Sequence, residues 1–159
     1  MKKLKIYLDT SVINFLFADD VPEKQEITKE FFENFVAKGK FIVYVSDVVI
    51  EEIEKTENVK KKKMLLEVIA KCSLEVFPLT KEAVDLANKY LDKKIIPEKK
   101  VEDARHIAIA TINECDALLS WNYKHLANIN KERKIIATNL EEGYNYLLRL
   151  VTPMEVMGE

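Results

Sequence analysis

Three carboxylate side chains in this 159-residue chain stand at positions where they could act together on a metal ion: Asp9, Glu52 and Asp103. In an open parallel sheet, ligands bind beyond the carboxyl ends of the strands, so an acid that follows a strand lies where a site can form. Converging carboxylates repel one another unless a cation neutralises them, and oxygen ligands favour Mg²⁺ or Mn²⁺ over zinc. Such an ion activates a bound water and stabilises negative charge at phosphorus, which is the chemistry of phosphodiester hydrolysis.

Each of these acids also has an ordinary structural explanation. Asp9 could close an Asx turn, Glu52 could be a solvated helix residue, and Asp103 could cap its helix. A shared site is favoured because all three fall at strand-to-helix junctions or inward helix faces of one predicted sheet. We therefore expect the three carboxylates to meet at the carboxyl edge of the first strand, and a structure that held them far apart would contradict this expectation.

Four other polar side chains are candidates for contact with a substrate. Ser11 could hold a metal-bound water or a phosphate, or could only cap a helix, and Asn14 could face the cleft from the same helix. His106 could touch the substrate, although a lone histidine on a mostly apolar helix is more often packed and hydrogen-bonded. His125 is either a phosphate contact or a structural tie, and the sequence does not decide between these two roles.

The acids need a sheet and helices to position them, and the sequence pattern predicts both. Short segments rich in β-branched and aromatic residues predict buried strands, and segments with apolar residues at helical spacing separate them. This alternation implies right-handed crossovers and an α/β fold, a single three-layer domain with a central parallel sheet of about five strands flanked by helices. The expected strands are 4–8, 41–45, 74–77, 117–121 and 134–137, with 147–151 as a further edge segment.

The helical pattern directs two of the acids inward. In the predicted helix 47–56, Glu52 lies at the margin of the apolar face. In the predicted helix 101–114, Asp103 lies on an apolar face near the positive end of the helix, where an anion is stabilised by roughly 0.3 to 1 kcal/mol. The other expected helices are 23–38, 64–71 and 80–92.

The composition fits one compact domain over residues 1–159, with 48% hydrophobic and 33% charged residues. No segment resembles a signal peptide or is long and apolar enough to span a bilayer, which predicts a cytoplasmic protein with no membrane partner. Cys72 and Cys115 form no zinc or disulfide motif.

Because the formal net charge is −2, nucleic acid would need a local basic patch. Lys60–Lys63 and Lys93–Lys100 are either such patches or simply solvated lysines.

Four blocks of sequence follow one another in a recognisable order. They are Leu8-Asp-Thr-Ser-Val12, Ser46-Asp-Val-Val-Ile-Glu-Glu-Ile53, Glu102-Asp-Ala-Arg-His-Ile-Ala-Ile-Ala110 and Asp116-Ala-Leu-Leu-Ser-Trp-Asn122. Together they resemble the successive motifs of a PIN domain, the nuclease family that contains the VapC-type toxins of bacterial and archaeal toxin–antitoxin pairs. The resemblance runs from Lys5 to about Asn139.

This resemblance implies a ribonuclease that cuts single-stranded RNA with Mg²⁺ or Mn²⁺ and leaves a 5′-phosphate and a 3′-hydroxyl. Asp9, Glu52 and Asp103 correspond to three acidic metal ligands of the family. Where many members have a fourth acid at a strand end, this chain has Asn122, a neutral ligand or substrate contact that would weaken binding of a second metal. Asp116 begins the same strand and is therefore expected at the opposite end from the site. The family also implies a small antitoxin protein as a partner, and a homodimer.

Two other interpretations stay open. A phosphatase with an aspartate nucleophile would also have Asp9 after its first strand, but it would need another aspartate where this chain has Ser11. A non-catalytic RNA-binding or interaction domain would keep the fold while the change at Asn122 had abolished metal binding. Calorimetric titration with Mn²⁺ would distinguish this last interpretation from a nuclease.

Overall fold

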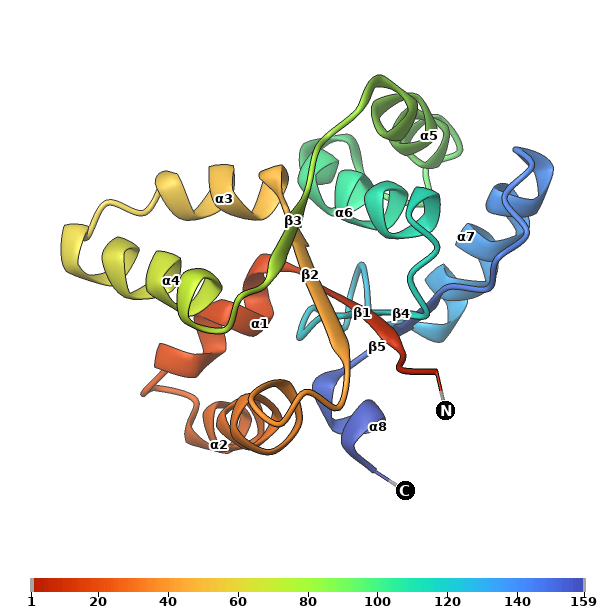
Figure 1. Cartoon of the computed structure of the whole chain (residues 1–159). Coiled ribbons are helices and arrows are strands. Elements are labelled where there is room, and N and C mark those ends of the chain that lie inside the picture. The colour runs from red at the N-terminus through yellow and green to blue at the C-terminus, as the bar shows by residue number, and fades with distance from the viewer. Residues whose placement is uncertain (1, 159) are drawn as a thin grey trace.

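The computed structural model describes residues 2–158 and is built on a five-stranded parallel sheet (Figure 1). The strands are β1 (Lys5–Leu8), β2 (Ile42–Ser46), β3 (Glu75–Phe77), β4 (Ala117–Leu119) and β5 (Arg149–Val151). They lie in the order β3-β2-β1-β4-β5, so β1 is central. Ile6, Tyr7 and Leu8 of β1 are fully buried, as expected for a parallel strand covered on both faces.

Helices cover both faces of the sheet and complete the expected three-layer α/β fold. They are α1 (Thr10–Asn14), α2 (Pro22–Phe31), α3 (Asp47–Glu54), α4 (Val59–Lys71), α5 (Lys81–Asp92), α6 (Val101–Ile112), α7 (Ile129–Glu141) and α8 (Pro153–Met157), with the short helical turns η1 (Phe15–Phe17), η2 (Phe32–Val36) and η3 (Glu98–Lys100). Figure 1 shows α5, α6 and α7 on one side of the sheet and α1, α2, α4 and α8 on the other, while α3 contacts α1 and α6. Within residues 2–158, no helix has the length and apolar character needed to cross a membrane.

Capping residues determine where several helices begin and end. The side chain of Ser46 accepts a hydrogen bond from the Val48 N–H at 3.1 Å and starts α3, and Thr80 accepts one from the Ala83 N–H at 3.1 Å and starts α5. Gly39 has a φ of +66°, which suits glycine, and it follows the end of η2. These three signals were readable in the sequence, and the helices begin and end at them.

The fifth strand is not the segment that the sequence pattern predicted. Residues 134–137 lie within α7, where Ile135 is 1% exposed, and β5 instead falls inside the 147–151 edge segment. A short apolar run is compatible with either a strand or a buried helix. The side chain of Asn128 caps a helix that starts before this run and continues through it, so the helix forms.

The order of the strands determines where a ligand crevice can form. From β1 the chain adds β2 and β3 on one side, then crosses to the other side of β1 to add β4 and β5. In such a sheet the crevice lies at the carboxyl ends of the two strands between which the direction reverses, here β1 and β4. Leu8 pairs with Leu119 at this point, so the residues that follow them, Asp9 and Ser120, are neighbours.

Candidate active site

Asp9 lies directly after β1 and is 4% exposed. Its Oδ1 accepts hydrogen bonds from Ser11 Oγ at 2.6 Å and from the Val12 N–H at 3.3 Å, so the carboxylate caps α1. Its Oδ2 accepts a hydrogen bond from Ser120 Oγ, just beyond β4, at 2.6 Å. Three donors from two adjoining strand ends therefore hold this carboxylate in one orientation.

Glu52 reaches the same edge of the sheet from α3. Its Oε1 accepts a hydrogen bond from Thr10 Oγ1 at 2.6 Å and lies 2.7 Å from His106 Nε2 on α6. The other ring nitrogen, His106 Nδ1, lies 2.6 Å from Tyr7 Oη, which lies 2.7 Å from Ser46 Oγ. Ser46, Tyr7 and His106 are buried, and with Glu52 they form what we call the buried hydrogen-bond chain. The buried hydrogen-bond chain joins β1, β2, α3 and α6 beneath the site.

Asp103 enters from the first turn of α6 and meets Asn122 from the segment after β4. Asn122 Nδ2 donates to Asp103 Oδ2 at 3.3 Å. The Asn122 Oδ1 accepts hydrogen bonds from the backbone N–H groups of Lys124 and His125, both at 3.1 Å. The amide of Asn122 therefore presents its donor to Asp103, while its oxygen, the atom that could bind a metal, is engaged by the backbone.

The pKa values of the three acids are shifted in different directions by their surroundings. Burial raises the pKa of Asp103 to about 6; the charge of His106 opposes this shift, and the negative charges of Asp9 and Glu52 add to it. Burial also raises the pKa of Asp9. Burial acts in the same direction on Glu52, but the hydrogen bond and charge of His106 bring the pKa of Glu52 below its usual value. Burial alone would lower the pKa of His106, yet its bond to Glu52 holds that pKa above the ordinary value. Contact with His106 therefore favours the ionised form of Glu52, whereas burial favours the protonated forms of both Asp9 and Asp103.

The donors of the site suit a hard divalent cation. Within residues 2–158, Glu52 Oε2 and Asp103 Oδ1 accept no protein hydrogen bond, and the raised pKa of Asp103 reflects negative charge that a cation would neutralise. Carboxylate oxygens are the ligands that Mg²⁺ and Mn²⁺ prefer. In the part of the chain that the structure describes, no three His, Cys, Asp or Glu side chains lie close enough together to hold a metal ion, so the expected meeting of the three carboxylates is not complete. The carboxylate oxygens therefore suit Mg²⁺ or Mn²⁺ as ligands, and the three acids lie near the carboxyl end of β1 without forming a preassembled metal site.

The four candidate substrate contacts differ in how accessible they are. Ser11 Oγ donates to Asp9 and accepts a hydrogen bond from the Trp121 N–H at 3.0 Å, so it joins the two strand ends. Asn14 is half-buried at the end of α1. His106 is 1% exposed and both of its nitrogens have protein partners, so it does not present a nitrogen to a substrate as placed. His125 is 9% exposed, and its backbone contact with Asn122 makes it part of the turn.

Asp116 lies at the opposite end of the sheet from these acids. It accepts hydrogen bonds from the Lys5 N–H at 2.7 Å and from Tyr146 Oη at 2.6 Å, which accounts for it structurally. Asp116 is therefore a useful reference acid: it stands at the start of β4, on the same strand as the site but outside it.

Three side chains that hold the acids were not singled out from the sequence. Ser120 and Thr10 donate to Asp9 and Glu52, and Tyr7 anchors His106. Thr10 and Ser120 did carry a signal, because each is a small hydroxyl residue at a predicted strand end. Tyr7 had none, since a tyrosine within an apolar strand also fits ordinary core packing.

Positive charge gathers next to the acids. Burial lowers the pKa of His125, and the charges of four nearby lysines lower it further. We call these four lysines the basic cluster; they are Lys99, Lys100, Lys124 and Lys131. Lys100 also acts on Asp103, whose pKa it lowers, so this member of the basic cluster lies near the acidic site. The arrangement suits a phosphate chain that approaches the acids across a positive surface.

Two comparisons with known proteins found a similar sequence family or a similar fold. The family model described as "PIN domain" matches residues 6–132. Among solved structures, the fold is similar to a chain in the crystal structure of VapBC2 from Rickettsia felis bound to a DNA fragment from their promoter, with a TM-score of 0.55 and 14% sequence identity. That match covers 92% of this chain and 98% of the other, and it shows a shared fold. No curated protein sequence matches the chain.

Proposed function

The chain belongs to the PIN-domain family, whose members are generally nucleases, and from this premise we propose that it is an endoribonuclease that hydrolyses single-stranded RNA with Mg²⁺ or Mn²⁺. The observation that carries the proposal is the set of Asp9, Glu52 and Asp103 around the carboxyl end of β1, with the pKa of Asp103 raised to about 6. A set of acids with that much uncompensated charge is suited to a bound cation.

We assign separate tasks to the residues of the site. Asp9, Glu52 and Asp103 would hold the ion, which would activate a water and neutralise charge at phosphorus. Asp9 offers a carboxylate that three donors keep from turning, and the buried hydrogen-bond chain fixes Glu52 from beneath. Asn122 donates to Asp103 and so aims its carboxylate. In-line attack by water would leave a 5′-phosphate and a 3′-hydroxyl.

The basic cluster is the path that we propose for the RNA. It adjoins Asp103 and His125, and phosphates crossing it would reach the acids without help from the overall charge of −2. Ser11 and Asn14 lie on α1, which begins directly after Asp9. An RNA substrate also implies that the protein acts in the cytoplasm.

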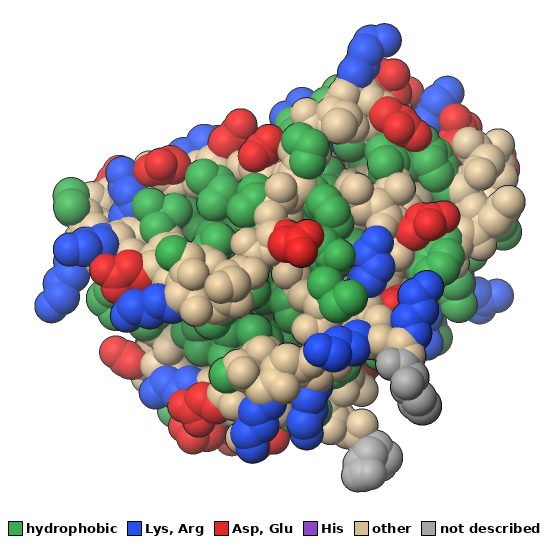
Figure 2. Space-filling view, viewed as in Figure 1, with side chains coloured by type: hydrophobic (Ala, Val, Ile, Leu, Met, Phe, Trp, Pro, Cys, Tyr) green, Lys and Arg blue, Asp and Glu red, His purple; other side chains and the backbone are tan. Residues whose placement is uncertain are grey.

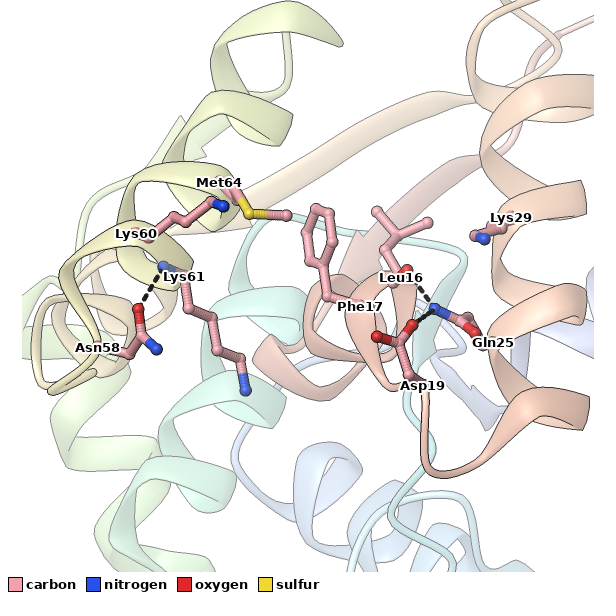
Figure 3. Close-up of a pocket in the computed structure, with 9 residues that line it drawn as sticks. All are labelled: Leu16, Phe17, Asp19, Gln25, Lys29, Asn58, Lys60, Lys61 and Met64. Atoms are coloured by element: carbon pink, nitrogen blue, oxygen red, sulfur yellow. Dashed lines mark hydrogen bonds between the residues drawn. The ribbon is translucent and has the colours of Figure 1, made fainter.

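A small antitoxin protein is the partner that we propose, and a hollow next to η1 is the surface that suits it. This hollow has a volume of about 460 Å³ and lies between η1, α2 and α4, with Leu16, Phe17 and Met64 at its apolar centre (Figure 3). Lys60 and Lys61 lie at its edge, and Figure 2 shows apolar side chains in the hollow between α4 and α2 with charged side chains around them. An acidic, amphipathic segment would match this surface. None of the site acids lines the hollow, so partner binding and catalysis use separate residues.

The nuclease proposal is tested by incubating the purified chain with a mixed pool of single-stranded RNA, with Mg²⁺ or Mn²⁺ and with EDTA. We expect cleavage only with the ion, with 5′-phosphate and 3′-hydroxyl ends in the mapped products. Binding of RNA without cleavage at millimolar Mn²⁺ would support the non-catalytic interpretation instead. Sedimentation of the same preparation tests the homodimer, which we expect at twice the mass of 18.4 kDa.

A further inference from the structure

Three aromatic rings surround the ammonium group of Lys24 beside the acidic site. Lys24 Nζ lies 4.7 Å from the centre of the Tyr123 ring, 5.6 Å from that of Trp121 and 5.7 Å from that of Phe15. Phe15 and Trp121 are tilted neighbours with centroids 5.9 Å apart, and Trp121 and Tyr123 meet edge to face at 6.3 Å. We call Phe15, Trp121, Tyr123 and Lys24 the aromatic–lysine cluster.

Hydrogen bonds to α2 fix the buried part of this cluster, while Tyr123 is exposed. Trp121 is 4% exposed, and its Nε1 donates to Thr28 Oγ1 at 3.0 Å. Thr28 Oγ1 in turn donates to the Lys24 carbonyl oxygen at 2.6 Å, so α2 holds both the indole and the start of the lysine side chain. Tyr123 is 50% exposed, and its carbonyl oxygen accepts a hydrogen bond from Asn128 Nδ2 at 3.2 Å. Lys24 is half-buried, so the most exposed part of the cluster is the Tyr123 side chain.

The cluster is joined directly to the proposed metal ligands. The Trp121 N–H donates to Ser11 Oγ at 3.0 Å, and Ser11 Oγ donates to Asp9 at 2.6 Å. The residue between Trp121 and Tyr123 is Asn122, which donates to Asp103. Tyr123 therefore follows directly after the residue that contacts Asp103, and Trp121 precedes it.

The chemistry of this surface selects a planar anion. An exposed aromatic ring stacks with nucleobases of any sequence, and an ammonium group next to it neutralises a phosphate. A cationic side chain from a protein partner is disfavoured, because Lys24 already occupies the position over the rings and would repel a second cation. A nucleotide satisfies both parts of the surface.

Building on the proposed nuclease function, we propose that the aromatic–lysine cluster is a binding subsite for a nucleotide that flanks the scissile phosphate. The base of this nucleotide stacks on Tyr123, and its phosphate lies against Lys24. Trp121 is the buried support of the platform and does not itself stack with the base. The subsite holds one end of the RNA while the acids act on the neighbouring linkage.

The test measures binding without cleavage, in EDTA, by fluorescence anisotropy of a labelled single-stranded oligoadenylate on the full chain. Because stacking on an aromatic ring is lost, we expect Tyr123→Ala to weaken binding about tenfold or more, and Tyr123→Phe to bind as the wild type does. Tyr146→Ala is the matched control, since Tyr146 is 40% exposed at the opposite end of the sheet. Lys24→Gln should weaken binding and reduce its dependence on salt.

Two further readouts separate stacking from charge. An oligonucleotide of the same length with abasic sites should bind wild type and Tyr123→Ala equally, because it keeps the phosphates and lacks the bases. Trp121 is the only tryptophan of the chain, so its fluorescence should change when oligoadenylate binds to the wild type. Equal binding of oligoadenylate by wild type and Tyr123→Ala would overturn the subsite. That result together with normal RNA cleavage would leave the nuclease proposal standing, and Tyr123-dependent binding without any cleavage would refute the nuclease proposal alone.

Discussion

The negative charge that Asp103 would use to bind a cation also lowers the stability of the folded chain. In the folded chain the pKa of Asp103 is about 6, above the ordinary value of 3.8. Asp103 therefore holds its proton more tightly in the folded chain than in the unfolded chain. Between about pH 4 and pH 6 the folded state therefore binds more protons than the unfolded state, and its stability falls as the pH rises through this window. At neutral pH, where Asp103 is ionised in both states, the whole of this loss of stability is present.

Removing that charge should stabilise the ion-free protein. We expect Asp103→Asn to raise the free energy of unfolding by about 1–2 kcal/mol at pH 7, less than the full pKa shift implies because the side chain is only partly buried. At pH 4 the difference should vanish. Urea denaturation in EDTA at both pH values measures this, with Glu51→Gln, an exposed acid on α3, as the control. A destabilised Asp103→Asn at pH 7 would contradict the electrostatic description.

Tyr7 shows what the buried hydrogen-bond chain contributes. Tyr7→Phe keeps the buried ring but removes the hydroxyl shared by Ser46 and His106, which should lower the free energy of unfolding by about 1–3 kcal/mol. Tyr144→Phe is the comparison, because the Tyr144 hydroxyl contacts Glu82 at the surface, and its removal should cost under about 0.5 kcal/mol. Thermal or chemical denaturation of both variants decides the point. Equal stability of the two variants would mean that the buried hydrogen-bond chain does not stabilise the fold.

Residue types and spacing were enough to propose the three acids as a site, but the sequence did not reveal which side chains contact them. Asp9, Glu52 and Asp103 follow recognisable strand-end and helix-face patterns, and in the structure each is hydrogen-bonded to a residue that follows β1 or β4. Their partners could not be predicted, because the contacts of Ser120 and Tyr7 cross 111 and 99 residues of sequence. Pairing of that kind depends on strand order, which the local pattern does not contain.

At the scale of elements, the local signals were strongest where a cap and a periodic pattern agreed. The starts of α3 and α5 followed from Ser46 and Thr80. Residues 134–137 were mispredicted as a strand because three consecutive apolar residues after Lys134 carry no periodicity of their own. The cap at Asn128, six residues earlier, determines their conformation.

The importance of that cap can be measured. Asn128 accepts hydrogen bonds from the N–H groups of Asn130 and Lys131, at 3.0 and 3.2 Å. We expect Asn128→Ala to lower the free energy of unfolding by about 1 kcal/mol, while Asn130→Ala, on the exposed side of the same helix, should change it little. Equal effects in urea denaturation would show that the side chain of Asn128 does not start α7.

At the scale of the whole molecule, the overall charge of −2 means that only local patches can attract RNA. Two patches are possible: the basic cluster beside the acids, and Lys60 with Lys61 at the hollow near η1. Their separation on the surface lets the salt dependence of binding distinguish RNA recognition from partner recognition.

The basic cluster should account for most of the salt dependence. With three to four phosphates neutralised, the logarithm of the RNA affinity should fall with the logarithm of salt concentration with a slope of about −2 to −3. The double variant Lys99→Gln with Lys124→Gln should make this slope shallower by about 1.4, since each lost contact contributes about 0.7. Lys60→Gln with Lys61→Gln should leave it unchanged. A larger effect of the second pair would place the RNA in the hollow near η1.

The most direct test of the proposed function is single-turnover cleavage of an end-labelled single-stranded RNA by a pair of matched variants. Asp103→Asn and Asp116→Asn make the same change at opposite ends of the sheet, one inside the proposed site and one outside it. With Mg²⁺ or Mn²⁺, we predict that Asp116→Asn cuts as the wild type does, that Asp103→Asn cuts at least about 100-fold more slowly, and that EDTA stops all cleavage. Cleavage by Asp103→Asn at the wild-type rate, or undiminished cleavage in EDTA, would contradict the metal-dependent site.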